Sequence, residues 1–305
     1  MQFWPSVGDA PLLATTDGSL LANATLVHLA GAFGIESSEQ YLVLCLLVSL
    51  IALCLPLVFF RGDRYGLALA VIVVAGGAVP PVLLSWVGGY DAAFVAAVSL
   101  GVLARNRVLC ASGWLLAGFS HYALAAAGLI LWLIVLAASR QQCRANQAFK
   151  ALAASLGVLV GWLAARFIAD SWGGSADRWS LFRSIRFEDL ANSFLASWYL
   201  IIFSSLGIAW LLLSFKEVWL HSATRGFAVS AVVASVALPL VAADETRIAA
   251  LALLPAALAW ISELSRQRQD AAPPNQSLRI LVLASLIVPV PVIWMGVPIR
   301  MGAFL

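Results

Sequence analysis

The chain has 305 residues, of which 62% are hydrophobic and only 11% are charged, and its mean hydropathy is +0.95. Soluble domains carry about 25% charged residues, so this composition excludes a soluble protein and predicts a polytopic membrane protein. The net charge of +3 requires no nucleic-acid partner, because membrane topology accounts for basic residues. The four cysteines are scattered along the chain and indicate neither a disulfide framework nor a metal cluster.

Residues 1–40 form a segment that we expect to lie outside the cytoplasm, with a membrane-surface helix over residues 20–33. Asp9 and Asp17 belong to an acidic stretch in which no Lys or Arg occurs before Arg61, and basic residues are what retain a segment in the cytoplasm. There is no basic n-region of a signal peptide. A tail of this length is awkward to translocate alone, so we expect an upstream transmembrane helix outside this chain.

Residues 41–305 are predicted to form one all-α transmembrane domain of roughly ten helices, several of them short or broken. The expected spans are 41–60, 66–87, 92–104, two short helices within 108–138, then 151–169, 193–214, 226–243, 248–261 and 280–295. Pro80-Pro81 should interrupt the second span. Pro289 and Pro291 should do the same to the last.

The span at 92–104 is too short for a bilayer. Thirteen residues cover about 20 Å, against a hydrocarbon core of roughly 30 Å. We therefore expect Asp91, which precedes this helix, to lie below the outer surface in a water-filled cavity.

The stretch from Val108 to Ala138 lies between two basic clusters that both favour the cytoplasmic side. A single crossing conflicts with these flanks, so we expect two short helices that turn near Gly118-Phe119-Ser120-His121. His121 would then lie within the outer half of the membrane. Two roles stay open for it: a hydrogen bond between helices, or a place in a functional site.

The longest polar loop is expected over residues 170–192, on the extracytoplasmic side. Arg183 and Arg186 have the i,i+3 spacing of one helical face, and aromatic residues surround them. The aromatic residues are typical membrane anchors. Guanidinium groups on this side suit recognition of a phosphate by paired hydrogen bonds.

The sequence Asp244-Glu245-Thr246-Arg247 separates two long apolar runs, Gly226–Ala243 and Ile248–Ile261. Ionisable groups at membrane depth are costly and usually functional. The alternative is a hydrated turn in which Asp244 caps the next helix and pairs with Arg247. We favour a functional site.

Together with the acidic outer segment, three motifs resemble the GT-C-type bacterial membrane glycosyltransferases that use polyprenyl-phosphate sugars, and the related polysaccharide polymerases. The motifs are Gly88-Gly89-Tyr90-Asp91 before a short helix, Ser120-His121-Tyr122, and Asp244-Glu245-Thr246-Arg247. The resemblance covers residues 9–262. It implies a GT-C-like fold in the bacterial cytoplasmic membrane and transfer of a sugar from a lipid-phosphate donor to an extracytoplasmic acceptor, in synthesis of a cell-envelope polysaccharide or glycan.

The resemblance also implies roles for acidic residues. Asp91 is the first candidate for the base that takes the proton of the acceptor hydroxyl, Asp9 is the second, and Asp244 belongs to the same catalytic group. The expected outer-loop pair of acids is not present, and Asp9 and Asp17 stand nearest to it. A divalent metal is compatible with this chemistry, but the sequence does not require one.

The expected substrate-binding residues are basic or aromatic. Arg247, with Arg183 or Arg186, would stabilise the charge that grows on the departing phosphate. His121 would orient the acceptor or donate a hydrogen bond, and Tyr90 is a further expected substrate-binding residue. The partners are thus a polyprenyl-phosphate sugar and membrane lipid.

Two other functions remain open at this stage. Broken helices and buried acids also describe a transporter or a flippase for lipid-linked substrates. The absence of an internal repeat and the placing of polar residues on one side argue against it. A structural subunit would tolerate substitution of Asp91 and Arg247.

Overall fold

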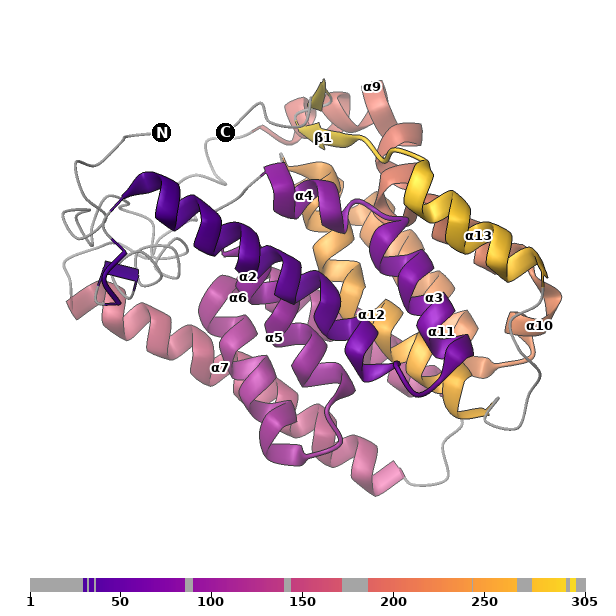
Figure 1. Cartoon of the computed structure of the whole chain (residues 1–305), viewed down its shortest axis with the longest axis horizontal. Helices are drawn as coiled ribbons and strands as arrows, with labels where there is room; N and C mark the ends of the chain where they lie inside the picture. The colour runs from indigo at the N-terminus through magenta and orange to yellow at the C-terminus, as the bar shows by residue number, and fades with distance from the viewer. Residues whose placement is uncertain are drawn as a thin grey trace.

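The protein is an all-α bundle with one short β-hairpin near its C-terminal end (Figure 1). The computed structural model describes residues 30–31, 33–35, 37–85, 90–139, 144–171, 186–242, 244–267, 276–294 and 297–299. The α-helices are α2 (Ser38–Phe59), α3 (Arg64–Ala75), α4 (Val79–Ser85), α5 (Asp91–Leu103), α6 (Arg107–Ala138), α7 (Arg144–Ser171), α9 (Phe187–Leu206), α10 (Lys216–Trp219), α11 (Ser222–Val232), α12 (Glu245–Gln267) and α13 (Gln276–Ile287). The remaining elements are the 3₁₀ helices η3 (Gly207–Ser214) and η5 (Pro239–Val241), the π-helical turn η4 (Val233–Ala237), and the antiparallel strands β1 (Val292–Trp294) and β2 (Val297–Ile299).

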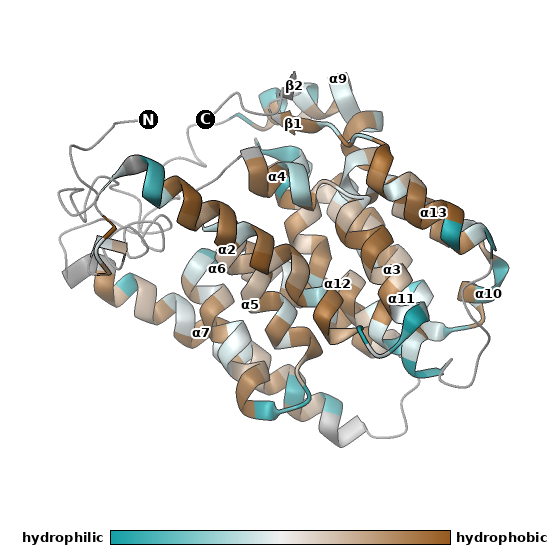
Figure 2. Ribbon diagram, in the orientation of Figure 1, coloured by the Kyte–Doolittle hydropathy of each residue, from teal (hydrophilic) through white to brown (hydrophobic). Residues whose placement is uncertain are grey.

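The chain is an integral membrane protein. Within the described residues, 6 helical segments are long and apolar enough to cross a bilayer, and three shorter apolar helices, α3, α5 and α13, accompany them. Figure 2 shows apolar residues along the helices and polar residues gathered at the loops between them. The membrane prediction is therefore confirmed at the level of an all-α bundle of apolar helices.

Helix α6 is not a straight rod, because it folds back on itself at His121. His121 has φ −158° and ψ 87°, which are extended values within an otherwise helical segment. The rings of Trp114 and Trp132 lie 5.2 Å apart, whereas eighteen residues of straight helix would separate them by about 27 Å. Two short helices joined near Gly118–His121 are thus what the structure contains, as the basic flanks predict. We name them α6a, before His121, and α6b, after it.

The expected span 66–87 is broken, but not at its prolines. Helix α3 ends at Ala75, and α4 begins at Val79 after Gly76 and Gly77. Pro80 and Pro81 lie in the first turn of α4, where a missing backbone N–H breaks no helical hydrogen bond. The two glycines, rather than the prolines, interrupt this span.

A second broken helix meets the first at its break. Helix α9 ends at Leu206, and Gly207, the first residue of η3, takes φ +54°. The Ile208 N–H donates to the Gly76 carbonyl (3.0 Å), and the Ala78 N–H donates to the Ser204 carbonyl (3.1 Å). These bonds satisfy backbone groups that would otherwise be costly in a membrane.

Helix α12 occupies the middle of the bundle (Figure 1) and packs against α3, α5, α6, α9 and α11. Every residue from 249 to 261 is buried. Near its far end, the Trp260 ring stacks on Phe227, and its indole N–H donates to Thr224 (2.9 Å). The predicted hairpin of two helices joined at residues 244–247 is therefore formed by α11 with η4 and η5 on one side and α12 on the other.

Helices α6a and α7 pack backbone against backbone. A Cβ atom added at Gly161 would lie 2.1 Å from the Leu115 carbonyl oxygen, and one at Gly118 would lie 2.5 Å from the Val158 carbonyl oxygen. Small residues allow such contact in membranes. Gly157 and Gly161 form a GxxxG motif at this contact.

Other boundaries differ from expectation or lie outside the described residues. Helix α7 continues to Ser171 and α9 starts at Phe187, so the polar loop is shorter than 170–192. The surface helix expected over residues 20–33 lies almost entirely outside the described residues. Helix α13 ends at Ile287, before Pro289, as predicted.

Candidate functional site

Four consecutive residues at the start of α12 connect it to three other elements. Asp244 immediately precedes the helix, and Glu245, Thr246 and Arg247 form its first turn. Acidic residues at this position interact favourably with the helix dipole, which explains why the chain can begin a buried helix here. We call the group formed by Asp91, Asp244 and Arg247 the ionic cluster.

The ionic cluster is built around the guanidinium of Arg247. Its Nε donates to Asp91 Oδ2 (2.7 Å) and its Nη2 donates to Asp91 Oδ1 (2.9 Å), so the two side chains form a bidentate pair. The Asp91 side chain is 1% exposed and that of Arg247 is 12% exposed. Removal of one partner from a buried pair of this kind costs about 3–5 kcal/mol.

Asp91 is therefore in a different environment from the one expected. Asp91 is indeed buried at the start of α5, but both of its carboxylate oxygens bind Arg247 instead of facing a water-filled cavity. A carboxylate held in this way is poorly placed to accept a proton. The geometry makes Asp91 the residue that fixes the orientation of Arg247.

Asp244 has the freer carboxylate of the two. Its Oδ2 accepts a hydrogen bond from Arg247 Nη1 (2.7 Å), and its Oδ1 is buried and accepts no hydrogen bond from any described residue. Burial raises the pKa of the Asp244 carboxyl above its ordinary value, and the nearby Arg247 opposes this shift. Both features suit a group that takes up a proton.

Tyr90 and His121 extend the ionic cluster. The Arg247 guanidinium lies over the Tyr90 ring, with Cζ 5.0 Å from the ring centroid, which is a cation–π contact. The His121 ring meets Tyr90 at 4.8 Å in a T-shaped arrangement. Both residues are buried, so the structure joins all three motifs singled out in the sequence.

His121 also begins helix α6b. Its Nδ1 accepts a hydrogen bond from the Leu124 N–H (3.4 Å), as a capping side chain does three residues ahead. In this arrangement Nδ1 acts as the acceptor, so the neutral ring carries its proton on Nε2.

Glu245 and Thr246 are structural members of the site that sequence reasoning passed over. Glu245 is fully buried and accepts a hydrogen bond from Ser193 of α9 (2.5 Å). Thr246 accepts one from the Ile293 N–H of β1 (3.0 Å). The same four-residue motif contained the signal, since each of its members has a polar side chain at membrane depth.

The remaining predicted residues do not join the ionic cluster. Arg186 immediately precedes α9 and pairs with Asp189 (3.5 Å), and the two side chains are 74% and 57% exposed. Asp9, Asp17 and Arg183 lie outside the described residues. Among the residues that the structure describes, no group of three or more His, Cys, Asp or Glu side chains could hold a metal ion.

No family model, curated protein or solved structure matches this chain. What the site does must therefore be argued from its own chemistry: a fixed guanidinium, a carboxylate with one oxygen unsatisfied by described residues, and two aromatic side chains.

Proposed function

We propose that the protein is a membrane glycosyltransferase that transfers a sugar from a polyprenyl-phosphate donor to an acceptor hydroxyl, in synthesis of a cell-envelope polysaccharide or glycan. The observation that carries this proposal is the ionic cluster of Asp91, Arg247 and Asp244 beside Tyr90 and His121. It combines a group that can hold a phosphate with a group that can remove a proton. These are the two tasks of such a transfer.

Asp244 is the base in this proposal, and Asp91 is a positioning residue. The acceptor oxygen attacks the anomeric carbon of the donor sugar while the bond from that carbon to the phosphate oxygen breaks. Asp244 takes the acceptor proton, and the lipid phosphate leaves with the bonding electron pair. This assignment differs from the expectation that Asp91 is the first candidate, because Arg247 occupies both oxygens of Asp91.

Arg247 would bind the phosphate through the edge that now contacts Asp244. Nη1 donates to Asp244, while Nε and Nη2 stay bound to Asp91. A phosphate that displaced Asp244 from Nη1 would gain a charge-assisted hydrogen bond and release the base in the same step. Asp91 would meanwhile keep the guanidinium in place.

The cluster would face the outside of the bacterial cytoplasmic membrane. We propose ten crossings, counting α6a, α6b and the shorter helices with the long ones. Basic residues then gather at the end opposite the cluster: Arg61, Arg64, Arg105, Arg107, Lys150, Lys216, Arg225 and Arg266. The positive-inside rule assigns that end to the cytoplasm.

Reconstitution with labelled polyprenyl-phosphate sugars tests the proposal. The purified protein in vesicles should release lipid phosphate and form a glycosylated product when a suitable acceptor is supplied. Asp244→Asn should stop release, whereas Asp189→Asn, which changes an exposed acid, should not. Equal release by wild type and Asp244→Asn would refute the assignment.

A transporter or flippase is the second candidate, and one observation favours it. The breaks between α3 and α4 and between α9 and η3 meet at Gly76 and Gly207, and paired broken helices are common in transporters. Movement of an intact lipid-linked sugar across the vesicle membrane, without release of lipid phosphate, would support this function instead.

A further inference from the structure

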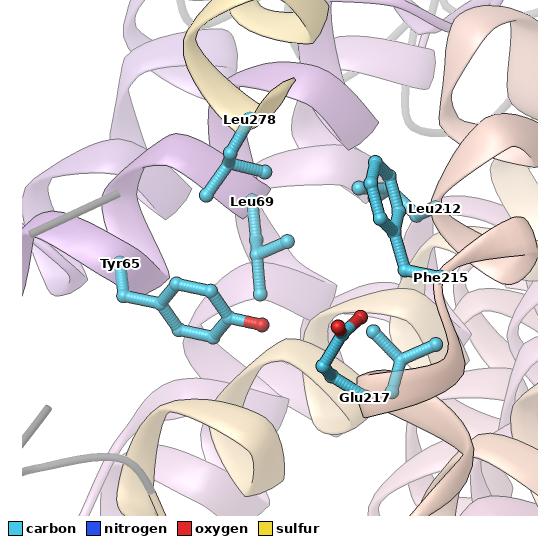
Figure 3. A pocket seen from close by; sticks show the side chains of 7 residues that line it. Tyr65, Leu69, Leu212, Phe215, Glu217 and Leu278 are labelled. Atoms are coloured by element: carbon cyan, nitrogen blue, oxygen red, sulfur yellow. The ribbon is translucent and has the colours of Figure 1, made fainter. Parts of the chain in front are cut away.

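A small cavity lies at the end of the bundle opposite the ionic cluster. It has a volume of about 60 Å³ and is lined by Tyr65, Leu69, Leu212, Phe215, Glu217, Val218 and Leu278. Figure 3 shows the Tyr65 hydroxyl pointing across the cavity toward the Glu217 carboxylate, while Leu69, Leu278 and Phe215 close its other side. The cavity therefore has one polar wall and one apolar wall.

The cavity lies at the boundary between apolar helices and polar loops. Tyr65 is the second residue of α3, Leu278 the third of α13, and Glu217 follows the end of η3 by three residues. Nearby, Trp219 is 41% exposed and donates its indole N–H to the Leu213 carbonyl (2.7 Å). Tryptophan at such a level is typical of the membrane–water interface.

Charged residues occur in the cavity lining and next to it in sequence. Glu217 is an exposed acid for which the described part of the chain provides no ion pair. Arg64, Lys216 and Arg279 are exposed, and each adjoins a lining residue in sequence. An acid thus lines the cavity, and exposed basic residues neighbour its lining residues along the chain; we call Arg64, Lys216 and Arg279 the basic rim.

This pattern is complementary to a zwitterionic lipid head group. A primary ammonium has three N–H donors, which a carboxylate and a hydroxyl can accept. The phosphate of the same lipid would face the basic rim, and its acyl chains would follow the apolar outer face of α13, where Ile280 and Leu283 are exposed. A trimethylammonium has no N–H donor, so it could not make these hydrogen bonds.

We propose that this cavity binds a phospholipid with a primary ammonium head group, and that Glu217 selects that group. The site is independent of the proposed glycosyl transfer, because it lies at the other end of the bundle and shares no residue with the ionic cluster. It would bind a lipid of the leaflet on that side, as a bound structural lipid rather than a substrate.

Native mass spectrometry of the purified full chain tests the site, with phosphatidylethanolamine, phosphatidylcholine and phosphatidylglycerol supplied in equal amounts. Phosphatidylethanolamine should be retained in preference to the other two. Glu217→Gln should lower the retention of phosphatidylethanolamine about tenfold, which is the contribution to affinity expected of one charge-assisted hydrogen bond. Glu188→Gln is the matched control, because Glu188 is an exposed acid at the start of α9.

Two results would overturn the proposal. Equal retention of phosphatidylethanolamine by wild type and Glu217→Gln would remove Glu217 as the selecting group. Stronger retention of phosphatidylglycerol than of phosphatidylethanolamine would show that the basic rim alone attracts an anionic lipid. Glu217 is exposed, so a thermal melt of Glu217→Gln that matches wild type confirms that a loss of lipid does not reflect unfolding.

Discussion

Replacement of Asp91 by alanine should strongly destabilise the folded protein. The substitution removes two of the three hydrogen bonds that Arg247 donates to the acids of the ionic cluster, and it leaves a guanidinium that is only 12% exposed. Breaking a buried pair costs about 3–5 kcal/mol. Asp244 still compensates part of the charge, so we expect about 3 kcal/mol.

The assay is reversible unfolding in mixed detergent micelles, followed by circular dichroism. Asp189→Ala is the matched control, because it breaks the exposed pair with Arg186 and should cost about 0–1 kcal/mol. If Asp91→Ala loses no more than this control, the ionic cluster does not hold α5 against α12. The burial argument would then be wrong.

Three further predictions concern Arg247, Asp244 and Gly207. Arg247→Lys keeps the charge but loses the bidentate fork, so turnover should fall about a hundred- to thousandfold with little change in protein abundance; near-normal turnover would return Arg247 to a structural role. Because the pKa of Asp244 is raised, activity should increase with pH, as Asp244 loses its proton, over a pH range above that of an ordinary carboxyl group. An increase of activity within the ordinary carboxyl range would contradict this prediction. Gly207→Ala should prevent stable folding, because its Cβ would lie 1.6 Å from the Gly76 carbonyl oxygen; wild-type yield and melting would show that the break can move.

The protonation of Asp244 affects protein stability and the reaction rate in opposite directions as the pH changes. A carboxyl whose pKa is raised by folding stabilises the folded state below its unfolded pKa, and this contribution is lost as the pH rises through the folded pKa. The deprotonated form needed for proton transfer is thus the less stable one. Asp244→Asn should remove this pH dependence of unfolding.

The sequence predicted the residues of the ionic cluster better than their roles. The short helix after Asp91 and the basic flanks of residues 108–138 are consequences of membrane thickness and charge, which act along the chain. These two features were sufficient to predict that Asp91 and His121 lie at a similar depth in the membrane. Which carboxylate Arg247 would occupy depends on side-chain geometry in three dimensions, and no spacing in the sequence encodes it.

The breaks in the helices were harder to locate. Proline is the residue that most clearly predicts a helix break from sequence. The break was therefore predicted at Pro80-Pro81, but these residues lie in the first turn of α4. Gly76 and Gly207 break their helices by meeting one another, although they are far apart in sequence. A contact of this kind has no local signature.

The burial of α12 on every side has a consequence for how its rotation is specified. An amphipathic helix is oriented by its apolar face, but residues 249–261 are buried all around, and turning the helix would exchange one apolar surface for another. The polar contacts of residues 244–247 with α5, α9 and β1 are satisfied in one orientation alone. One residue inserted after Arg247 would rotate the rest of α12 by about 100° relative to these contacts. The contacts of residues 244–247 therefore determine the rotation of the central helix about its axis.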